Sequence, residues 1–365
     1  MSVVETRGIV VWKAGEPVTP EPIVVDEPGP GEVLVRVQAS GVCHTDLHVH
    51  SGHIGEPPIL LGHEGAGIVE AVGPGVDAPA VGDYVILAWR APCGRCRFCR
   101  RGMLHLCAAS LNARPRQHTP TGAYPPPILG IGTFATHTVV AAQQAVVVTS
   151  EIPPAQASLI GCGVVTGIGA ALYTAAVRAG SSVAVFGCGT VGTSVLQGAR
   201  LAHAAKIIAV DIAPRKLEWA RQFGATHVVN ATEVDPVAAI HDLTDGYGVD
   251  YAFEAVGHPD VLQQALASRD LAGVVTIIGV PGRGTSITLD LPRYFDLGGS
   301  LRVSWYGDNL PSRDFPLLVD WYLKGDLLLD QLITQHVSLD DTQHAFDAMD
   351  RGETLKSVID LESAG

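Results

Sequence analysis

Four cysteines lie within fifteen residues of this sequence, at a spacing typical of a metal site. They are Cys93, Cys96, Cys99 and Cys107. Four thiolates complete a tetrahedral zinc shell and leave no open position, so the pattern predicts a structural zinc. The same residues also fit an iron–sulfur cluster or a redox pair, and spacing alone leaves these alternatives open.

A second possible metal site uses residues that are far apart in the sequence. Cys43, His63 and Cys162 together offer a Cys2His set whose fourth position is open to water or substrate. A single Cys or His is more often a packed core residue than a ligand. Beside a four-cysteine cluster, the three together favour a catalytic zinc. His50 and His53 are interpreted as surface or loop residues without assigned chemistry.

A glycine-rich motif follows an apolar run and precedes a helical stretch. Its glycines, Gly187, Gly189 and Gly192, would let the backbone approach a pyrophosphate at the helix N-terminus. Asp211 ends the next apolar run, where a carboxylate can hold the adenosine ribose 2'-hydroxyl. Because this acid would repel a 2'-phosphate, the motif predicts NAD rather than NADP. Cys188, inside the loop, is interpreted as a small filler residue.

The elements that must position these residues suggest two domains, since 365 residues exceed one ordinary domain. The first 150 residues read as short strands separated by turns, at 8–12, 32–39, 67–72 and 84–88. From about Val164 apolar strands alternate with helical stretches, which predicts a doubly wound parallel sheet of the α/β class. Those strands are expected at 182–186, 207–210, 227–229, 251–253, 274–280 and 300–304. Helices at 316–324 and 340–349 and a final strand at 355–361 complete the expected order.

The composition excludes several classes of protein. A formal net charge of -13 argues against binding nucleic acid through phosphate neutralisation. No uninterrupted apolar run reaches about 18 residues, so we expect no membrane span. The N-terminal residues have neither a basic leader nor an apolar stretch before a cleavage site. We therefore expect a cytoplasmic protein, in which clustered cysteines indicate metal rather than disulfides.

The motifs, taken in order, resemble the zinc-containing medium-chain dehydrogenase family, that of the liver and yeast alcohol dehydrogenases. The resemblance covers nearly the whole chain, including the Gly-His-Glu-Gly-Ala-Gly segment from Gly62, the cysteine cluster, the glycine motif and the C-terminal Leu355-Lys356-Ser357. It implies a Rossmann NAD-binding domain at 164–303. It also implies a β-rich GroES-like catalytic domain made of 1–163 and 304–365. With this resemblance, zinc is favoured over iron–sulfur for the four cysteines.

The resemblance also implies roles for individual residues near the catalytic zinc. Thr45 matches the hydroxyl that takes the alcohol proton, and His48 matches the histidine that passes it to solvent. Asp46 and Glu64 match carboxylates near the metal, and Glu64 is included among the metal-site residues. Trp89, Ile128 and Leu129 match residues that line the substrate pocket.

Further matches concern the cofactor. His44 and Lys356 stand where relatives often have phosphate-binding arginines, which leaves no bidentate guanidinium at either position. Thr166 matches a residue that packs on the nicotinamide ring. The remaining cofactor residues implied by the resemblance are Gly187, Gly189, Thr190, Val191, Gly192, Asp211, Lys216, Val256 and Val280.

The expected activity is hydride transfer between a primary or aromatic alcohol and NAD, with two zinc ions per chain and a homo-oligomeric enzyme. Two other hypotheses remain. Three segments are similar to actinobacterial members of the family: Gly161-Cys162-Gly163-Val164, the arginine-rich cysteine segment and Ser304-Trp-Tyr-Gly-Asp308. Those members include mycothiol-dependent formaldehyde dehydrogenases, which oxidise a thiol–formaldehyde adduct. The chain could also be a non-catalytic binding protein on the same fold.

Overall fold

The computed structural model describes residues 3–361, which form two compact units. The first unit runs up to Cys162 and resumes at Leu310, and the second is the continuous segment Gly163–Asn309. The second unit is therefore an insertion in the sequence of the first.

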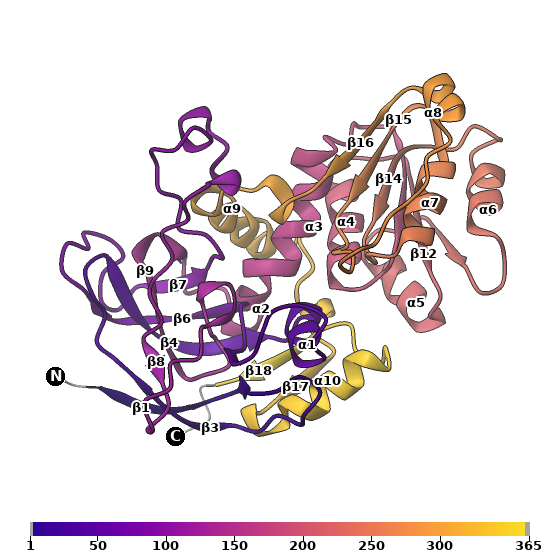
Figure 1. Ribbon diagram of the computed structural model, residues 1–365. Helices are drawn as coiled ribbons and strands as arrows, with labels where there is room; N and C mark the ends of the chain where they lie inside the picture. Colours follow the sequence, from indigo (N-terminus) through magenta and orange to yellow (C-terminus); the bar gives the residue numbers. More distant parts are fainter. Residues whose placement is uncertain (1–2, 362–365) are drawn as a thin grey trace. The chain divides into compact units, whose positions relative to one another are not determined.

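The first unit is built on an open sheet with the strand order β10-β7-β6-β4-β18-β17, in which β9 also pairs with β4. The last strand in the described part of the chain, β18, lies between β4 and β17, so segments from before and after the second unit meet in one sheet (Figure 1). The strands of this sheet are β4 (Glu32–Gly41), β6 (Gly65–Val72), β7 (Tyr84–Leu87), β9 (His137–Ala141), β10 (Ala145–Val147), β17 (Gln335–Val337) and β18 (Ser357–Asp360).

Smaller elements complete this unit. The remaining strands form two small sheets: β1 (Val4–Gly8), β3 (Glu21–Val25) and β8 (Gln117–His118) in one, β2 (Val10–Val11) and β5 (Ile59–Leu60) in the other. The helices are α1 (His44–His50), α2 (Pro154–Leu159), α9 (Pro311–Leu323) and α10 (Thr342–Asp350). One apolar core joins both parts of the sequence, because Phe134 and Val49 pack with Phe346, Met349 and Ile359.

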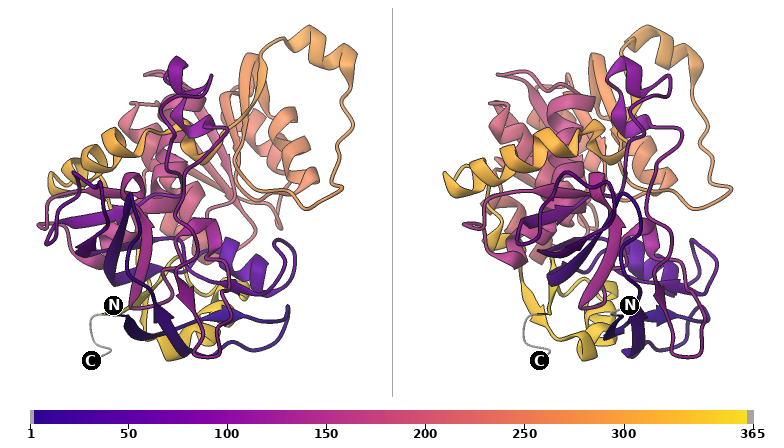
Figure 2. Two further views of the ribbon diagram at one scale, coloured as in Figure 1. Left: turned by 60° about the vertical axis from the view of Figure 1, so that its left-hand side comes forward. Right: turned by 90° about the vertical axis from the view of Figure 1, so that its left-hand side faces the viewer.

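The second unit is a six-stranded parallel sheet with the order β13-β12-β11-β14-β15-β16. The order reverses direction at β11, so right-handed crossovers place helices on both faces. The predicted α/β doubly wound sheet is confirmed. Its strands are β11 (Ser182–Phe186), β12 (Lys206–Asp211), β13 (His227–Asn230), β14 (Val249–Glu254), β15 (Arg269–Ile277) and β16 (Ser300–Val303). Its helices are α3 (Val165–Gly169), α4 (Thr190–Leu201), α5 (Pro214–Gln222), α6 (Pro236–Leu243), α7 (Pro259–Ala267) and α8 (Leu291–Leu297). The segment that carries α8, between β15 and β16, extends away from the sheet (Figure 2).

Several expected boundaries differ from those in the structure. The unit junctions fall after residues 162 and 309 rather than after 163 and 303. Residues 304–309 stay with the second unit because Thr174 donates hydrogen bonds to Ser304 (2.9 Å) and to Asp308 (2.8 Å). The helix expected at 316–324 begins five residues earlier, at Pro311, and tolerates Pro316 in its first turns.

One helical run, Pro154–Thr174, has the length and the mean hydropathy (1.6) to cross a membrane. It combines α2 and α3 with two π-helical turns, Ile160–Val164 and Ala170–Thr174. However, 89% of its most apolar window is buried inside the protein, as in the core helix of a folded domain.

Candidate active site and metal centres

Cys43, His63, Glu64 and Cys162, here called the Cys43 group, come together in the first unit. One potential ligand atom of each lies within 4.8 Å of the others. Cys43 is the N-cap of α1, His63 and Glu64 lie between β5 and β6, and Cys162 lies in the π-helical turn after α2. Three segments that are distant in sequence therefore supply the four side chains.

Two glycines make this approach possible. Gly62 has a φ of +90°, and a Cβ there would clash with the backbone nitrogen of Phe134. Gly41 lies against Glu64, where a Cβ would clash with a carboxylate oxygen. Both positions need glycine, the first for its backbone conformation and the second for space.

Asp46 connects two members of the Cys43 group. Its carboxylate accepts a hydrogen bond from the backbone N–H of Cys43 (3.3 Å) and lies 3.2 Å from Nδ1 of His63. It also accepts from the N–H of Gly62 (2.9 Å). Asp46 and His63 are both fully buried, so these contacts fix the ring orientation and direct the other nitrogen, Nε2, away from Asp46.

Lys356 forms a buried ion pair with Glu64, with 2.5 Å between Nζ and Oε2. The two side chains are 2% and 0% exposed. The sequence predicts Lys356 as a cofactor-phosphate contact, whereas the structure places its ammonium against a carboxylate of the Cys43 group. The cation is therefore used to compensate a charge buried beside the proposed metal.

The Cys43 group has the chemistry that zinc requires. Nε2 of His63 is buried and has no hydrogen-bond partner among residues 3–361. The pKa of the Cys43 thiol lies well below its ordinary value, chiefly because Cys162 donates a hydrogen bond to it, and burial raises the pKa of Cys162. Two sulfurs, an imidazole nitrogen without a partner and a carboxylate fit a zinc ion with at least one exchangeable position.

The four clustered cysteines form a second group. Potential ligand atoms of Cys93, Cys96, Cys99 and Cys107 also lie within 4.8 Å of one another. We call residues 93–107 the cysteine lobe; it holds two short 3-10 turns, Cys99–Arg101 and Leu104–Leu106, and no strand. A guanidinium N–H of Arg90 donates to the carbonyl of Cys107 and ties the end of the lobe to the segment before it.

Backbone N–H groups in the lobe point at sulfur. Hydrogen bonds from Cys99 and Ala108 lower the pKa of Cys96 to about 6, and those from Arg95 and Cys96 lower the pKa of Cys93. Burial raises the pKa of Cys99 to about 12. Amides that stabilise thiolates fit a four-thiolate zinc site, which has no open position for substrate.

The two expected proton-relay residues lie on α1. Thr45 is half-buried and only two residues after Cys43, while His48 lies one turn further along the helix. Burial lowers the pKa of His48, and the charge of the nearby His53 contributes to the shift. His48 is therefore mostly neutral near pH 7, as a proton acceptor must be. His44, at the start of α1, is exposed.

The three expected pocket residues have different environments. Trp89 lies edge-on to His63, with 5.9 Å between the ring centroids. Ile128 packs into the core of the first unit, and Leu129 is 39% exposed with a φ of +51°. Asn112, which the sequence analysis did not identify, donates to the carbonyls of Trp89 (2.8 Å) and Leu129 (3.0 Å). No motif marks Asn112, because its importance comes from tertiary contacts.

The glycine motif occupies the turn between β11 and α4 in the second unit. Gly187 has a φ of +92°, and a Cβ on Gly192 would clash with the carbonyl of Gly187. Gly189 is the N-cap of α4, directly before Thr190 and Val191, and a Cβ there would meet nothing within 4 Å. The structure thus provides a tight turn and open space at a helix N-terminus, as phosphate binding requires.

Asp211 lies at the end of β12 and holds the same turn. Its carboxylate accepts from the N–H of Cys188 (2.7 Å) and from that of Ala213 (2.9 Å). Burial raises the pKa of the Cys188 thiol, and the charge of Asp211 raises it further. The charge of Lys216, on α5, acts in the opposite direction, so Lys216 also lies near this turn. The predicted cofactor residues of this unit therefore gather around the carboxyl ends of β11 and β12.

Three other predicted cofactor residues, Val256, Val280 and Thr166, also belong to the second unit. Val256 and Val280 are 53% and 66% exposed, and they follow β14 and β15. A Cβ on Gly187 would touch Val256, which places Val256 beside the glycine turn. Thr166 on α3 is 8% exposed, and its hydroxyl has no hydrogen-bond partner within the described residues.

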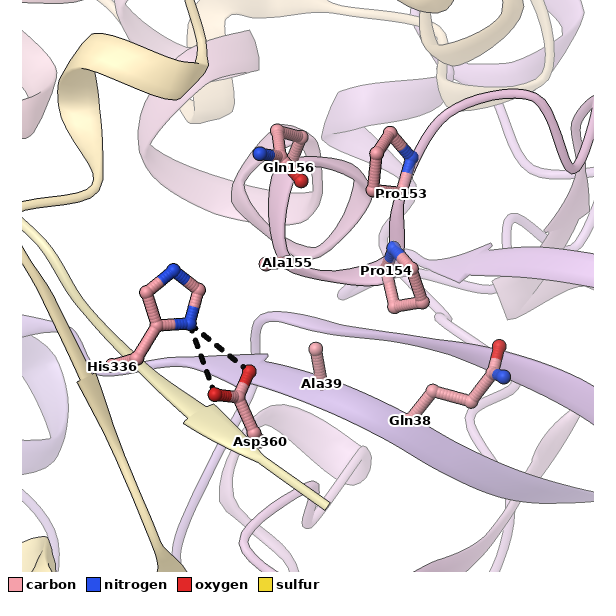
Figure 3. Close-up of a pocket in the computed structure, with 8 residues that line it drawn as sticks. All are labelled: Gln38, Ala39, Pro153, Pro154, Ala155, Gln156, His336 and Asp360. Atoms are coloured by element: carbon pink, nitrogen blue, oxygen red, sulfur yellow. Dashed lines mark hydrogen bonds and ion pairs between the residues drawn. The ribbon is translucent and has the colours of Figure 1, made fainter. Parts of the chain in front are cut away.

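A surface hollow of about 600 Å³ lies elsewhere on the first unit and is lined by Gln38, Ala39, Pro153–Gln156, His336 and Asp360. The imidazole of His336 and the carboxylate of Asp360 face each other at 3.0 Å (Figure 3). Both side chains are about half exposed. No residue of the predicted sites lines this hollow.

Comparison with known proteins gives two family matches. Residues 29–154 match the alcohol dehydrogenase GroES-like domain, and residues 190–324 match the zinc-binding dehydrogenase domain. An S-(hydroxymethyl)glutathione dehydrogenase of Aspergillus oryzae is 41% identical over 97% of this chain and 96% of its own length. The chain belongs to the zinc-containing medium-chain alcohol dehydrogenase family. An S-(hydroxymethyl)glutathione dehydrogenase of Escherichia coli is 39% identical, over 97% of this chain and 99% of its own length.

Solved structures of this alcohol dehydrogenase family agree closely with the present fold. An alcohol dehydrogenase zinc-binding domain protein from Burkholderia ambifaria has a TM-score of 0.93 at 37% identity, covering 98% of this chain and 99% of its own. Benzyl alcohol dehydrogenase from Acinetobacter calcoaceticus has a TM-score of 0.91 at 34% identity, with the same coverage. The expected Rossmann and GroES-like architecture and the expected oxidoreductase class are confirmed.

Proposed function

We propose that this chain oxidises a primary or aromatic alcohol to its aldehyde, using Zn²⁺ at the Cys43 group and NAD. The observation that carries the proposal is the buried set of two thiols, one unpartnered imidazole nitrogen and one carboxylate. When bound, Zn²⁺ supplies Lewis acidity toward the alcohol oxygen and NAD supplies the hydride acceptor.

The surrounding residues then have distinct tasks. Cys43, His63 and Cys162 bind the metal, and Asp46 holds His63 in the orientation that presents Nε2. Thr45, beside the metal ligands on α1, takes the proton of the substrate hydroxyl, and His48 passes that proton outward. This order places the hydroxyl next to the metal ligand Cys43 and the titratable imidazole one turn further along the helix.

In the second unit, we assign the glycine turn to the cofactor pyrophosphate and Asp211 to the adenosine ribose. The open space at Gly189 and the amides at the start of α4 support the first assignment. A carboxylate at the end of β12 supports a preference for NAD, because it repels a 2'-phosphate. His44, Lys216, Thr166, Val256 and Val280 are assigned to the remaining cofactor contacts.

Two substrate classes fit the proposal. Trp89 beside His63 favours an aromatic alcohol, and one solved structure with 34% identity is a benzyl alcohol dehydrogenase. A hydroxymethyl–thiol adduct is the second candidate, because two curated relatives with 41% and 39% identity are S-(hydroxymethyl)glutathione dehydrogenases. Both substrates present a primary hydroxyl to the same zinc.

A kinetic screen separates these candidates. Measuring kcat/KM for ethanol, benzyl alcohol and formaldehyde, each with and without an added low-molecular-weight thiol, identifies the substrate class, and repeating it with NADP tests the cofactor. Thiol-dependent oxidation of formaldehyde would favour the adduct, and efficient benzyl alcohol oxidation without thiol would favour the aromatic alcohol. Absence of NAD reduction with every substrate would contradict the proposal.

The proton relay is tested at its first residue. Thr45→Ala should lower kcat/KM roughly a hundredfold or more, because the substrate proton loses its acceptor, whereas Thr45→Ser keeps a hydroxyl and should be mild. Equal losses in the two variants would show that Thr45 acts through packing rather than through its hydroxyl.

A further inference from the structure

His53, in the loop that follows α1, lies against His48. The two ring centroids are 5.6 Å apart and the ring planes are inclined by 58°. His48 is half-buried, whereas His53 is exposed. A second and more exposed imidazole therefore lies beside the expected relay histidine, although no motif assigns chemistry to it.

The backbone and one hydroxyl hold His53 in place. Its N–H donates to the carbonyl of His48 (2.8 Å), and its Nδ1 shares a hydrogen bond with Oγ of Ser51 (2.5 Å). The Ser51 hydroxyl also donates to the carbonyl of His48, at 3.3 Å. Because that hydroxyl has one proton, this arrangement favours the tautomer in which Nδ1 donates to Ser51 and Nε2 remains the basic nitrogen.

The surroundings of His48 disfavour a proton on its ring. Burial is the main cause and the charge of His53 adds to it, whereas the Cys43 thiolate opposes both. His44 is a further titratable neighbour, with its ring centroid 6.2 Å from that of His48. In the segment that packs beside this loop, Lys13 and Glu16 pair with each other at 2.6 Å. A positive charge on the outer ring therefore disfavours one on His48.

We propose that His53 is the outer proton-relay residue, which accepts the proton from His48 and delivers it to bulk water. The N–H bond of His48 breaks as an N–H bond forms on His53, through one bridging water at this ring separation, and no electrons move. One proton leaves for each alcohol oxidised. The proposal rests on the proposed function, since it needs His48 to carry the substrate proton.

His50 provides a matched control. It is another histidine of the same segment, but its Nε2 lies 3.0 Å from the carbonyl of Glu16 and its ring packs on Phe346 with a centroid distance of 5.4 Å. It therefore lies outside the His48–His53 pair. His50→Gln removes one imidazole from the same surface without removing the relay.

The first test does not depend on turnover. In the zinc-loaded protein, NMR titration of the histidine ring protons should show that His53→Gln raises the pKa of His48, because the competing cation is gone. His50→Gln should leave the His48 titration unchanged. An unchanged His48 titration in His53→Gln would show that the rings are uncoupled and would overturn the proposal.

The second test measures proton release in a single turnover with NAD and the alcohol identified by the substrate screen, using a pH indicator in weak buffer. His53→Gln should slow release roughly threefold to tenfold, less than an inner acid–base residue, and added imidazole should restore it. His48→Gln should also release the proton more slowly. The double variant His48→Gln/His53→Gln should release it no more slowly than His48→Gln, since both residues act in one path. His50→Gln should match the wild type.

The outcomes distinguish the relay from the proposed function. If proton release in His53→Gln follows the same time course as in the wild type while release in His48→Gln is slow, the role of His53 is overturned and that of His48 stands. Losses that multiply in the double variant overturn the shared path. A His48→Gln enzyme as fast as the wild type removes the inner residue from the proposed function, although alcohol oxidation itself stands.

Discussion

Two buried carboxylates lie beside the proposed catalytic zinc and have different partners. Asp46 contacts an imidazole and backbone amides, whereas Glu64 contacts the ammonium of Lys356. The amides and the imidazole stabilise Asp46 through hydrogen bonds, but Glu64 depends mainly on the charge of Lys356, with a smaller contribution from that of His63. The Lys356–Glu64 pair is therefore the more vulnerable of the two arrangements.

We expect Lys356→Met to lower stability strongly, because Glu64 would remain buried without its cation. Breaking one partner of such a pair costs about 3–5 kcal/mol, so the Tm should fall by at least roughly 6 °C. Arg36→Ala, which breaks an ion pair whose partners are 40% and 36% exposed, is the control and should cost less than about 1 kcal/mol. Similar shifts in both variants would show that the ammonium of Lys356 is solvated.

Glu254, at the end of β14, gives a prediction about pH. Burial raises its pKa above the ordinary 4.5, although the N–H groups of Val256 (2.8 Å) and Gly257 (2.7 Å) oppose the shift. The folded state thus holds this proton more firmly than the unfolded state, and the contribution of Glu254 to stability falls as pH rises from 4.5 through the raised pKa. Glu254→Gln should remove that fall, so its Tm relative to the wild type should increase between pH 4 and pH 7. A Tm difference that does not vary with pH would contradict this account.

How much of the site the sequence predicts depends on the kind of residue. Cysteine and histidine are the usual zinc ligands, so the members of the Cys43 group and of the cysteine lobe could be predicted from residue type and spacing. The partner of Lys356 could not, because it depends on β18 lying beside β4. Asn112 and His53 were missed for the same reason, since their significance lies in what they contact.

At the scale of elements, the two metal groups have different supports. The Cys43 group is held by α1, by the turn before β6 and by the helical run after α2. The cysteine lobe has only short 3-10 turns, and none of its described residues belongs to a strand. A metal there must supply folding free energy that secondary structure does not.

Metal analysis should therefore give two zinc ions per chain, and removal of each should have a different effect. Cys99→Ala should lower solubility or Tm, because the lobe loses the ion that orders it. Cys162→Ala should abolish turnover and leave the far-UV circular dichroism spectrum close to that of the wild type. If the effects of the two substitutions were exchanged, the structural and catalytic assignments would be reversed.

The buried parallel strands were the most predictable elements. The strand 182–186 has the predicted bounds, since a continuous apolar run flanked by turns has few alternatives. Strand β15 begins at Arg269 rather than at 274, because its first residues include exposed Leu271 and a glycine that interrupt the apolar pattern. Strands β9 and β10 were not predicted, and they are defined mainly by pairing with β4 and β7.

At the scale of the whole molecule, the two units differ in sequence continuity. The second unit has its own core, in which Phe186, Ile208 and Val275 pack with residues of the same segment. The core of the first unit combines Phe134 with Phe346 and Ile359, which come after the insertion.

This difference predicts how fragments behave. A fragment of residues 163–309 should be soluble and unfold cooperatively by circular dichroism, because its six-stranded sheet is complete. A fragment of residues 1–162 should aggregate or unfold without cooperativity, since it lacks β17, β18 and α10. A cooperative transition in the fragment 1–162 with zinc present would show that β17, β18 and α10 are dispensable for the core of the first unit.

The position of β18 also sets an order of events on the ribosome. Cys43, His63 and Cys162 are all synthesised before the insertion, but about 190 residues separate Cys162 from Lys356. At bacterial or eukaryotic elongation rates, this interval lasts about 10 to 40 s. Until it ends, the half of β4 that leads to Cys43 lacks its neighbour strand, and Glu64 lacks its cation. A zinc ion captured early would meet an incomplete sheet and a carboxylate free to compete as a ligand, so the final coordination of the metal at this centre should be reached only after β18 has been synthesised.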